Sequence, residues 1–152
     1  MSERGSSSVV VVDTMAVSAI VNATRAPTVA GSYRTVIAGR PIVVSFASVT
    51  ELRYGALKAG WGDIRRQSLE RDLSRLVVVQ PDDELIRGCA QLRVDCEQIG
   101  HSLGQKIHEA DRWIAATAIM LGVDLISDDG VFDGVPGLVV TKRASSNEAP
   151  DS

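Results

Sequence analysis

The chain alternates short, continuous apolar runs with longer segments in which apolar residues recur every three or four positions. The short runs are rich in valine, isoleucine and leucine. Continuous apolar character is typical of strands that are buried on both faces of a sheet. We therefore predict strands over residues 8–12, 42–46, 76–80, 123–127 and 138–141.

The longer segments between these runs have helical periodicity. A helix is expected directly after Asp13, and Ser48 or Thr50 is the expected cap of a helix through residues 51–60. The further helices are predicted over residues 28–39, 63–76, 82–99 and 109–121, with residues 100–106 as a loop. Strands that alternate with helices predict an α/β fold with three α/β/α layers around a mainly parallel central sheet.

Length and composition favour a single domain. A chain of 152 residues with 45% hydrophobic residues buries about two-thirds of its unfolded surface in one core. We expect this domain over residues 8–142, between flexible polar segments at residues 1–7 and 143–152. The first apolar run is far too short for a signal peptide or a membrane span, so we expect a cytoplasmic protein without a membrane partner.

The two cysteines do not indicate a disulfide or a zinc site. Cys89 and Cys96 lie about two helical turns apart, roughly 10 Å, which is too far for a disulfide between them. Only His101 and His108 are near them in the sequence. We expect both thiols to be buried as small apolar groups.

The charge distribution leaves a nucleic-acid contact open. The net charge is −3, but the segment from Arg53 to Arg75 contains six basic and three acidic residues, a local balance of +3. This segment either faces phosphates or forms a solvated helix face with ion pairs such as Arg66 to Glu70. Nucleotide chemistry is not expected, because the chain has neither a GxxxxGK loop nor a GxGxxG motif.

Acidic residues recur near the predicted strand ends. Asp13 and Asp129 directly follow strands, while Glu51 and Asp111 lie near the start of helices. Sites in parallel sheets form beyond the carboxyl ends of the strands, so these side chains are candidates for one pocket. Each also has a local alternative: Asp13 as a helix cap, Glu51 in a capping box, Asp111 at a helix dipole, and Asp128 with Asp129 in a turn.

Taken together, the acids point to a metal. Clustered carboxylates repel and raise one another's pKa, so such a cluster normally needs a cation to stay ionised. Mg²⁺ and Mn²⁺ prefer oxygen ligands and need no histidine or cysteine. We therefore expect Mg²⁺ or Mn²⁺ at this site.

The same segments resemble a known family. VVVVDTMAVSAIV, SVTELRYGA, EADRWIAATAIMLGVDLISDDGVF and VPGLVV, in this order over roughly residues 9 to 141, are similar to the successive signatures of PIN-domain ribonucleases, in particular VapC-type toxins. The ELRYGA and DRWIAATA segments are the most specific parts. The chain departs from the pattern at Met15, where the family often has asparagine.

The resemblance implies a PIN fold and a set of site residues. It implies that the catalytic acids and metal ligands are Asp13, Glu51, Asp111 and Asp129, with Asp128 as a further candidate ligand if the pattern is shifted by one place. Thr14 and Ser127 match small hydroxyl positions that orient a carboxylate or a water. Arg112 and Arg53 are candidate contacts for substrate phosphate, although an exposed helix arginine is the alternative for Arg112.

The resemblance also implies an activity and partners. It implies an endoribonuclease toxin that hydrolyses RNA phosphodiester bonds with Mg²⁺ or Mn²⁺ and inhibits growth until a cognate antitoxin protein neutralises it. A homodimer is expected as well. The alternative is a catalytically weak PIN scaffold that binds RNA or a protein partner through the basic segment over residues 53–75.

Overall fold

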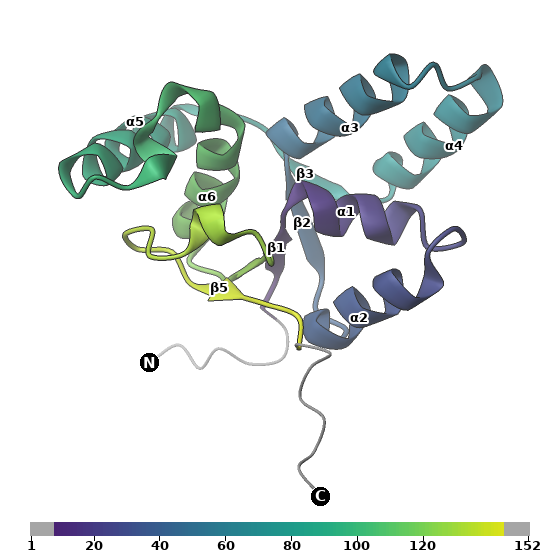
Figure 1. The fold of residues 1–152 in the computed structure, drawn as a ribbon, viewed down its shortest axis with the longest axis horizontal. Helices are drawn as coiled ribbons and strands as arrows, with labels where there is room; N and C mark the ends of the chain where they lie inside the picture. The colour runs from purple at the N-terminus through teal and green to yellow at the C-terminus, as the bar shows by residue number, and fades with distance from the viewer. Residues whose placement is uncertain (1–7, 145–152) are drawn as a thin grey trace, which may run out of the picture.

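A parallel sheet forms the centre of the molecule (Figure 1). The computed structural model describes residues 8–144. Within that range the sheet has five strands in the order β3-β2-β1-β4-β5, and every neighbouring pair is parallel. The strands are β1 (Val10–Val12), β2 (Ile42–Ser45), β3 (Val77–Val79), β4 (Leu125–Ile126) and β5 (Val140–Thr141). The predicted α/β class with a parallel sheet is confirmed, although each of these five strands is shorter than expected.

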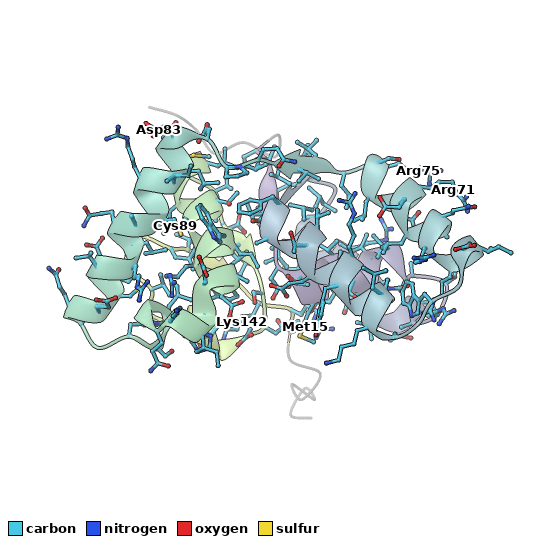
Figure 2. All side chains as sticks on the ribbon, turned by 90° about the horizontal axis from the view of Figure 1, so that it is seen from above. Met15, Arg71, Arg75, Asp83, Cys89 and Lys142 are labelled. Atoms are coloured by element: carbon cyan, nitrogen blue, oxygen red, sulfur yellow. The ribbon has the colours of Figure 1, made fainter. Side chains whose placement is uncertain are left out.

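Helices cover both faces of the sheet, which gives the predicted three layers. The α-helices among the described residues are α1 (Thr14–Val21), α2 (Pro27–Ile37), α3 (Phe46–Lys58), α4 (Asp63–Ser74), α5 (Asp83–Gln98) and α6 (Glu109–Leu121). Val10 and Val12 pack in a core with residues of α1 to α4, while Val11 packs in a second core with α5 and α6. Figure 2 shows this separation from above, with Arg71 and Arg75 on one side and Asp83 and Cys89 on the other.

Successive residues of β1 thus face opposite cores, and all of β1 is buried. This explains the continuous apolar run in the sequence, because a central strand between two helical layers has no solvent-facing side. The strand order places β1 in the middle of the sheet, between β2 and β4. Asp13, the residue directly after β1, therefore lies at the centre of one sheet edge.

The start of α3 differs from the prediction. The helix begins at Phe46, and the side chain of Ser45, the last residue of β2, caps it by accepting a hydrogen bond from the Ala47 N–H at 3.2 Å. Ser48 and Thr50 lie inside the helix, so neither is its cap. The strand runs directly into the helix because Ser45 serves both elements. The capping-box interpretation of Glu51 is therefore wrong.

The predictions for the cysteines are confirmed. Cys89 and Cys96 are free and buried on the inner face of α5, and burial raises the pKa of both thiols.

None of the helices described between residues 8 and 144 has the length and apolarity that crossing a bilayer requires.

The first residue of the predicted C-terminal tail contacts the domain. Arg143, which we placed in a flexible tail, packs on the domain: its guanidinium carbon lies 4.2 Å from the ring centre of Tyr33 in α2, and its side chain contacts Asp128. We also predicted flexibility for residues 1–7 and for the rest of the tail. Residues 1–7 and 145–152 lie outside the described residues.

Candidate functional site

Asp13 is the most buried acid of the site. It follows β1 and is 5% exposed. One carboxylate oxygen accepts a hydrogen bond from the Ala16 N–H at 2.8 Å and so caps α1, while the other accepts from the hydroxyl of Ser127. Burial raises the pKa of Asp13, and the charges of Asp129 and Asp128 raise it further, while its two hydrogen bonds oppose the shift. Asp13 is therefore both a helix cap and part of the acidic site.

The neighbouring strand supplies the turn from Ser127 to Asp129. Val12 of β1 pairs with Ile126 of β4, so the residues that follow these two strands lie side by side. Ser127 is fully buried, and its hydroxyl oxygen also accepts a hydrogen bond from the Asp129 N–H at 3.1 Å. The Asp129 carboxylate accepts from the Val131 N–H at 3.0 Å. Ser127 thus links the two strand-end acids.

Glu51 and Asp111 approach the site from α3 and α6, which pack against each other. Desolvation raises the pKa of Glu51, followed by the charge of Asp111, and the charge of Asp13 adds to the shift. Burial also raises the pKa of Asp111, with Asp129 as the charge that adds to it. Each of the four acids thus interacts electrostatically with at least one other, as a shared site requires.

Two polar contacts orient these side chains. His108 Nδ1 lies 3.3 Å from an Asp111 carboxylate oxygen, and this contact opposes the rise in the pKa of Asp111. The Thr14 hydroxyl donates a hydrogen bond to the Ser48 hydroxyl at 2.9 Å, which joins α1 to α3, the helix that carries Glu51. Hydrogen bonding by Thr14 also opposes the rise in the pKa of Glu51. His108 was not predicted as an orienting group, because it lies just before the predicted helix; in the structure it is the residue directly before α6, three positions from Asp111.

The donor set fits a hard divalent cation. Asp13, Glu51, Asp111 and Asp129 offer only carboxylate oxygens, and their mutual repulsion is what a bound cation relieves. Across residues 8–144, however, no three acidic, histidine or cysteine side chains lie close enough to form a complete metal site. The acids lie at one edge of the sheet, but their side chains do not converge closely enough to bind one ion together in this conformation.

The carboxylate of Asp128 pairs with Arg143. Its two carboxylate oxygens accept hydrogen bonds from the backbone N–H of Arg143 at 2.9 Å and from the Arg143 Nε at 2.6 Å. Burial alone would raise the pKa of Asp128, but these two hydrogen bonds lower it below its ordinary value. Asp128 is thus paired with Arg143, whereas the Asp129 carboxylate has no ion-pair partner among the described residues and accepts only the Val131 N–H.

The interpretation of Arg112 needs a correction. This side chain is only 3% exposed, and its guanidinium donates hydrogen bonds to the backbone carbonyls of Leu103 at 3.0 Å and Gln105 at 2.5 Å. It is neither an exposed helix arginine nor a group that faces substrate. It fastens the loop before α6 to that helix.

Arg53 is also occupied. Its Nε and one terminal nitrogen donate hydrogen bonds to the two carboxylate oxygens of Glu70 in α4, at 2.9 and 2.8 Å. Arg66 pairs with Asp63 rather than with Glu70 as we expected. The basic segment over residues 53–75 thus has ion pairs, as the solvated-face alternative expects, although with other partners than predicted. Arg53 is not free to bind phosphate in this conformation.

Met15 is the position where the sequence departs from the family pattern. Its side chain is 69% exposed, and the position of Asp13 at the end of β1 does not depend on it.

Comparisons with known proteins agree with this architecture. Residues 10–138 match the family model described as PIN domain. Ribonuclease VapC5 of Mycobacterium tuberculosis (strain ATCC 25618 / H37Rv) is 29% identical over 98 residues, which cover 63% of this chain and 70% of that protein.

Solved structures share the fold. The structure of VapBC2 from Rickettsia felis, bound to a DNA fragment from its promoter, has a TM-score of 0.72 at 21% identity and covers 90% of this chain and 100% of its own. VapBC-5 from Mycobacterium tuberculosis, a member of the VapBC family of toxin–antitoxin systems, has a TM-score of 0.61 at 25% identity and covers 88% and 98%.

Proposed function

This chain belongs to the PIN domain family, and from that premise we propose that it is a metal-dependent endoribonuclease of the VapC type. The observation that carries the proposal is the convergence of Asp13, Glu51, Asp111 and Asp129, which come from four separate segments of the chain. The pKa of Asp13, of Glu51 and of Asp111 is raised first by burial and further by the charge of another acid of this set. The reaction is hydrolysis of RNA phosphodiester bonds. The similarity to a protein named Ribonuclease VapC5 supports this class of reaction.

We infer that Mg²⁺ or Mn²⁺ is held by Asp13, Glu51, Asp111 and Asp129. When bound, such an ion lowers the pKa of a water molecule and stabilises negative charge on the phosphate that is attacked. The ordinary preference of both ions for oxygen ligands agrees with this donor set. Metal binding would require acidic side chains to move, because the acids among the described residues do not form a complete metal site. Glu51 and Asp129 are exposed, so their side chains have room for such movement.

The protein residues around these acids set their position before metal or RNA arrives. The Ala16 N–H and the Ser127 hydroxyl fix both oxygens of Asp13. His108 contacts Asp111, and the Thr14–Ser48 hydrogen bond fixes the helix that carries Glu51. Outer groups of this kind hold the charged side chains in the orientation that binding requires.

The proposed partners are supported by the same relatives. Solved VapBC structures are toxin–antitoxin systems by name, which supports a cognate antitoxin that neutralises this chain. We propose that the free chain inhibits growth by cleaving cellular RNA, and that it forms a homodimer. Measurement of the molar mass of the purified chain at micromolar concentration tests the homodimer.

Cleavage of RNA by the purified full chain tests the function. We expect cleavage with Mn²⁺ or Mg²⁺, loss of cleavage in EDTA, and recovery when metal is added back. Glu51→Gln should abolish cleavage, while the same change on the far helix α5, Glu84→Gln, should leave it intact. RNA binding that persists in EDTA without any cleavage under either condition would instead favour the binding-module alternative.

A further inference from the structure

The turn that carries Asp129 is held from outside the acidic site by Arg143. β4 and β5 are parallel, with Ile126 paired to Thr141. The ladder continues one step further through the Ser127 N–H, which donates to the Thr141 carbonyl at 3.1 Å. Continuing this register places Asp128 beside Arg143. The edge strand β5 is thus short, but it ends where it can reach the turn after β4.

Arg143 grips Asp128 at two points. The backbone N–H of Arg143 donates to one carboxylate oxygen of Asp128 at 2.9 Å, and its Nε donates to the other at 2.6 Å. Both oxygens of Asp128 are thereby engaged. Since Asp128 precedes Asp129 directly, fixing this side chain also fixes the direction in which the Asp129 side chain leaves the turn.

The guanidinium group of Arg143 also contacts helix α2. One terminal nitrogen of Arg143 donates to the Ser32 hydroxyl at 3.0 Å, and the guanidinium lies over the ring of Tyr33, 4.2 Å from the ring centre. Tyr33 is 2% exposed and packs in the core that contains Val12. The side chain of Arg143 therefore transmits the position of α2 to the turn after β4.

We propose that Arg143 is a positioning residue, which holds Asp128 away from the acidic site and so keeps Asp129 as the acid available there. The effect of Arg143 on metal binding rests on the proposed function, whereas its contacts with Asp128, Ser32 and Tyr33 do not. An arginine suits this role because its planar fork donates along two directions while its face stacks on an aromatic ring, which a lysine cannot do. Without the Arg143 side chain, Asp128 loses its side-chain donor, and its carboxylate is then able to compete with that of Asp129.

The test compares Arg143→Met, which keeps most of the apolar length but no donors, with the matched control Arg93→Met. Arg93 makes an exposed ion pair with Glu97 within α5, away from the site. Two quantities are measured on full-length protein: amide hydrogen exchange at Asp129 and Val131 without metal, and Mn²⁺ affinity by calorimetry. We expect Arg143→Met to speed exchange at both amides and to weaken Mn²⁺ binding about tenfold, and Arg93→Met to change neither.

Two further variants separate positioning from charge and from direct ligation. Arg143→Lys keeps the positive charge but not the fork, so it should resemble Arg143→Met. Asp128→Asn should weaken Mn²⁺ binding no more than Arg143→Met does, and the double variant should be no worse than the poorer single one. If Asp128 were itself a ligand, Asp128→Asn would lose the metal while Arg143→Met kept it, and positioning by Arg143 would be overturned.

The outcomes distinguish this inference from the proposed function. Unchanged exchange and unchanged Mn²⁺ affinity in Arg143→Met overturn the positioning role, and so does wild-type behaviour of Arg143→Lys. If the wild-type chain binds no Mn²⁺, the proposed metal site fails. Faster amide exchange at Asp129 in Arg143→Met would still support positioning of the turn in that case.

Discussion

The hydroxyl of Ser127 donates a hydrogen bond to the carboxylate of Asp13, 114 positions away in the chain. The two residues follow the adjacent parallel strands β4 and β1. Ser127 is fully buried and Asp13 nearly so. This bond therefore ties two strand ends together at the point where the acids gather.

Replacing Ser127 with alanine should destabilise the fold. Ser127→Ala leaves a buried oxygen of Asp13 and the Asp129 N–H without their partner, which should lower the free energy of unfolding by about 1–3 kcal/mol. Urea denaturation without metal measures the loss. Ser74→Ala, on the exposed end of α4, is the control, and an equal loss in both variants would contradict a specific role for Ser127.

Neutralising Glu51 should stabilise the metal-free protein at neutral pH. The pKa of Glu51 in the folded state is raised above its ordinary value of 4.5. The folded state therefore binds more protons than the unfolded state between these two pKa values, and stability falls as pH rises through this window. Above the window the ionised side chain is a net cost, which Glu51→Gln removes.

The pH dependence of that difference provides the check. We expect Glu51→Gln to unfold at higher urea than the wild type at pH 7 in EDTA, and the gap to close as the pH approaches 4.5, where the wild-type carboxyl takes up its proton. Glu84→Gln should show no such trend. A gap that stays constant over this range of pH would argue against a raised pKa at Glu51.

Mn²⁺ should stabilise the folded protein through the acidic site. A ligand that binds only the folded state adds about 2.7 kcal/mol of stability at a concentration of a hundred times its Kd. We expect the wild-type melting temperature to rise with Mn²⁺ and to return to its starting value in EDTA. The double variant Glu51→Gln/Asp111→Asn should lose most of this rise. The same rise in that variant would place the metal elsewhere.

Arg112 should matter for stability rather than for RNA contact. Arg112→Met leaves the carbonyls of Leu103 and Gln105 without their donor, which should cost about 3 kcal/mol. Arg87→Met, which removes an exposed pair with Asp83, should stay within about 0.5 kcal/mol. Affinity of the folded variant for RNA, measured below its melting temperature, should equal that of the wild type. A selective loss of RNA affinity would restore Arg112 as a substrate contact.

The periodicity of the sequence was sufficient to predict the strands and the layers. Val10, Val11 and Val12 are all buried because β1 lies between two helical layers. A strand in that environment is recognisable in the sequence as a continuous apolar run. The capping of α3 was harder to predict, because Ser45, Ser48 and Thr50 are all acceptable caps by residue type. Only the actual end of β2 decides between them.

The candidate acids of the site were predictable, but their surroundings were not. Asp13 and Asp129 follow strands, and a shared sheet edge brings such positions together. The burial of Arg112 depends on a loop that folds back over α6, and no local pattern indicates that. Likewise, the choice between Asp128 and Asp129 depends on Arg143, whose neighbourhood is set by the register of β4 against β5.

The strand order has a consequence for synthesis on the ribosome. Asp13 and Glu51 are translated early, but β4 and the turn with Ser127 and Asp129 come near the end, after α6 has supplied Asp111. Until then the central strand β1 lacks one of its two neighbours. A prematurely terminated product that stops before β4 therefore lacks Ser127 and Asp129, so the carboxylate of Asp13 at the end of β1 has neither its buried hydroxyl partner nor the neighbouring acid.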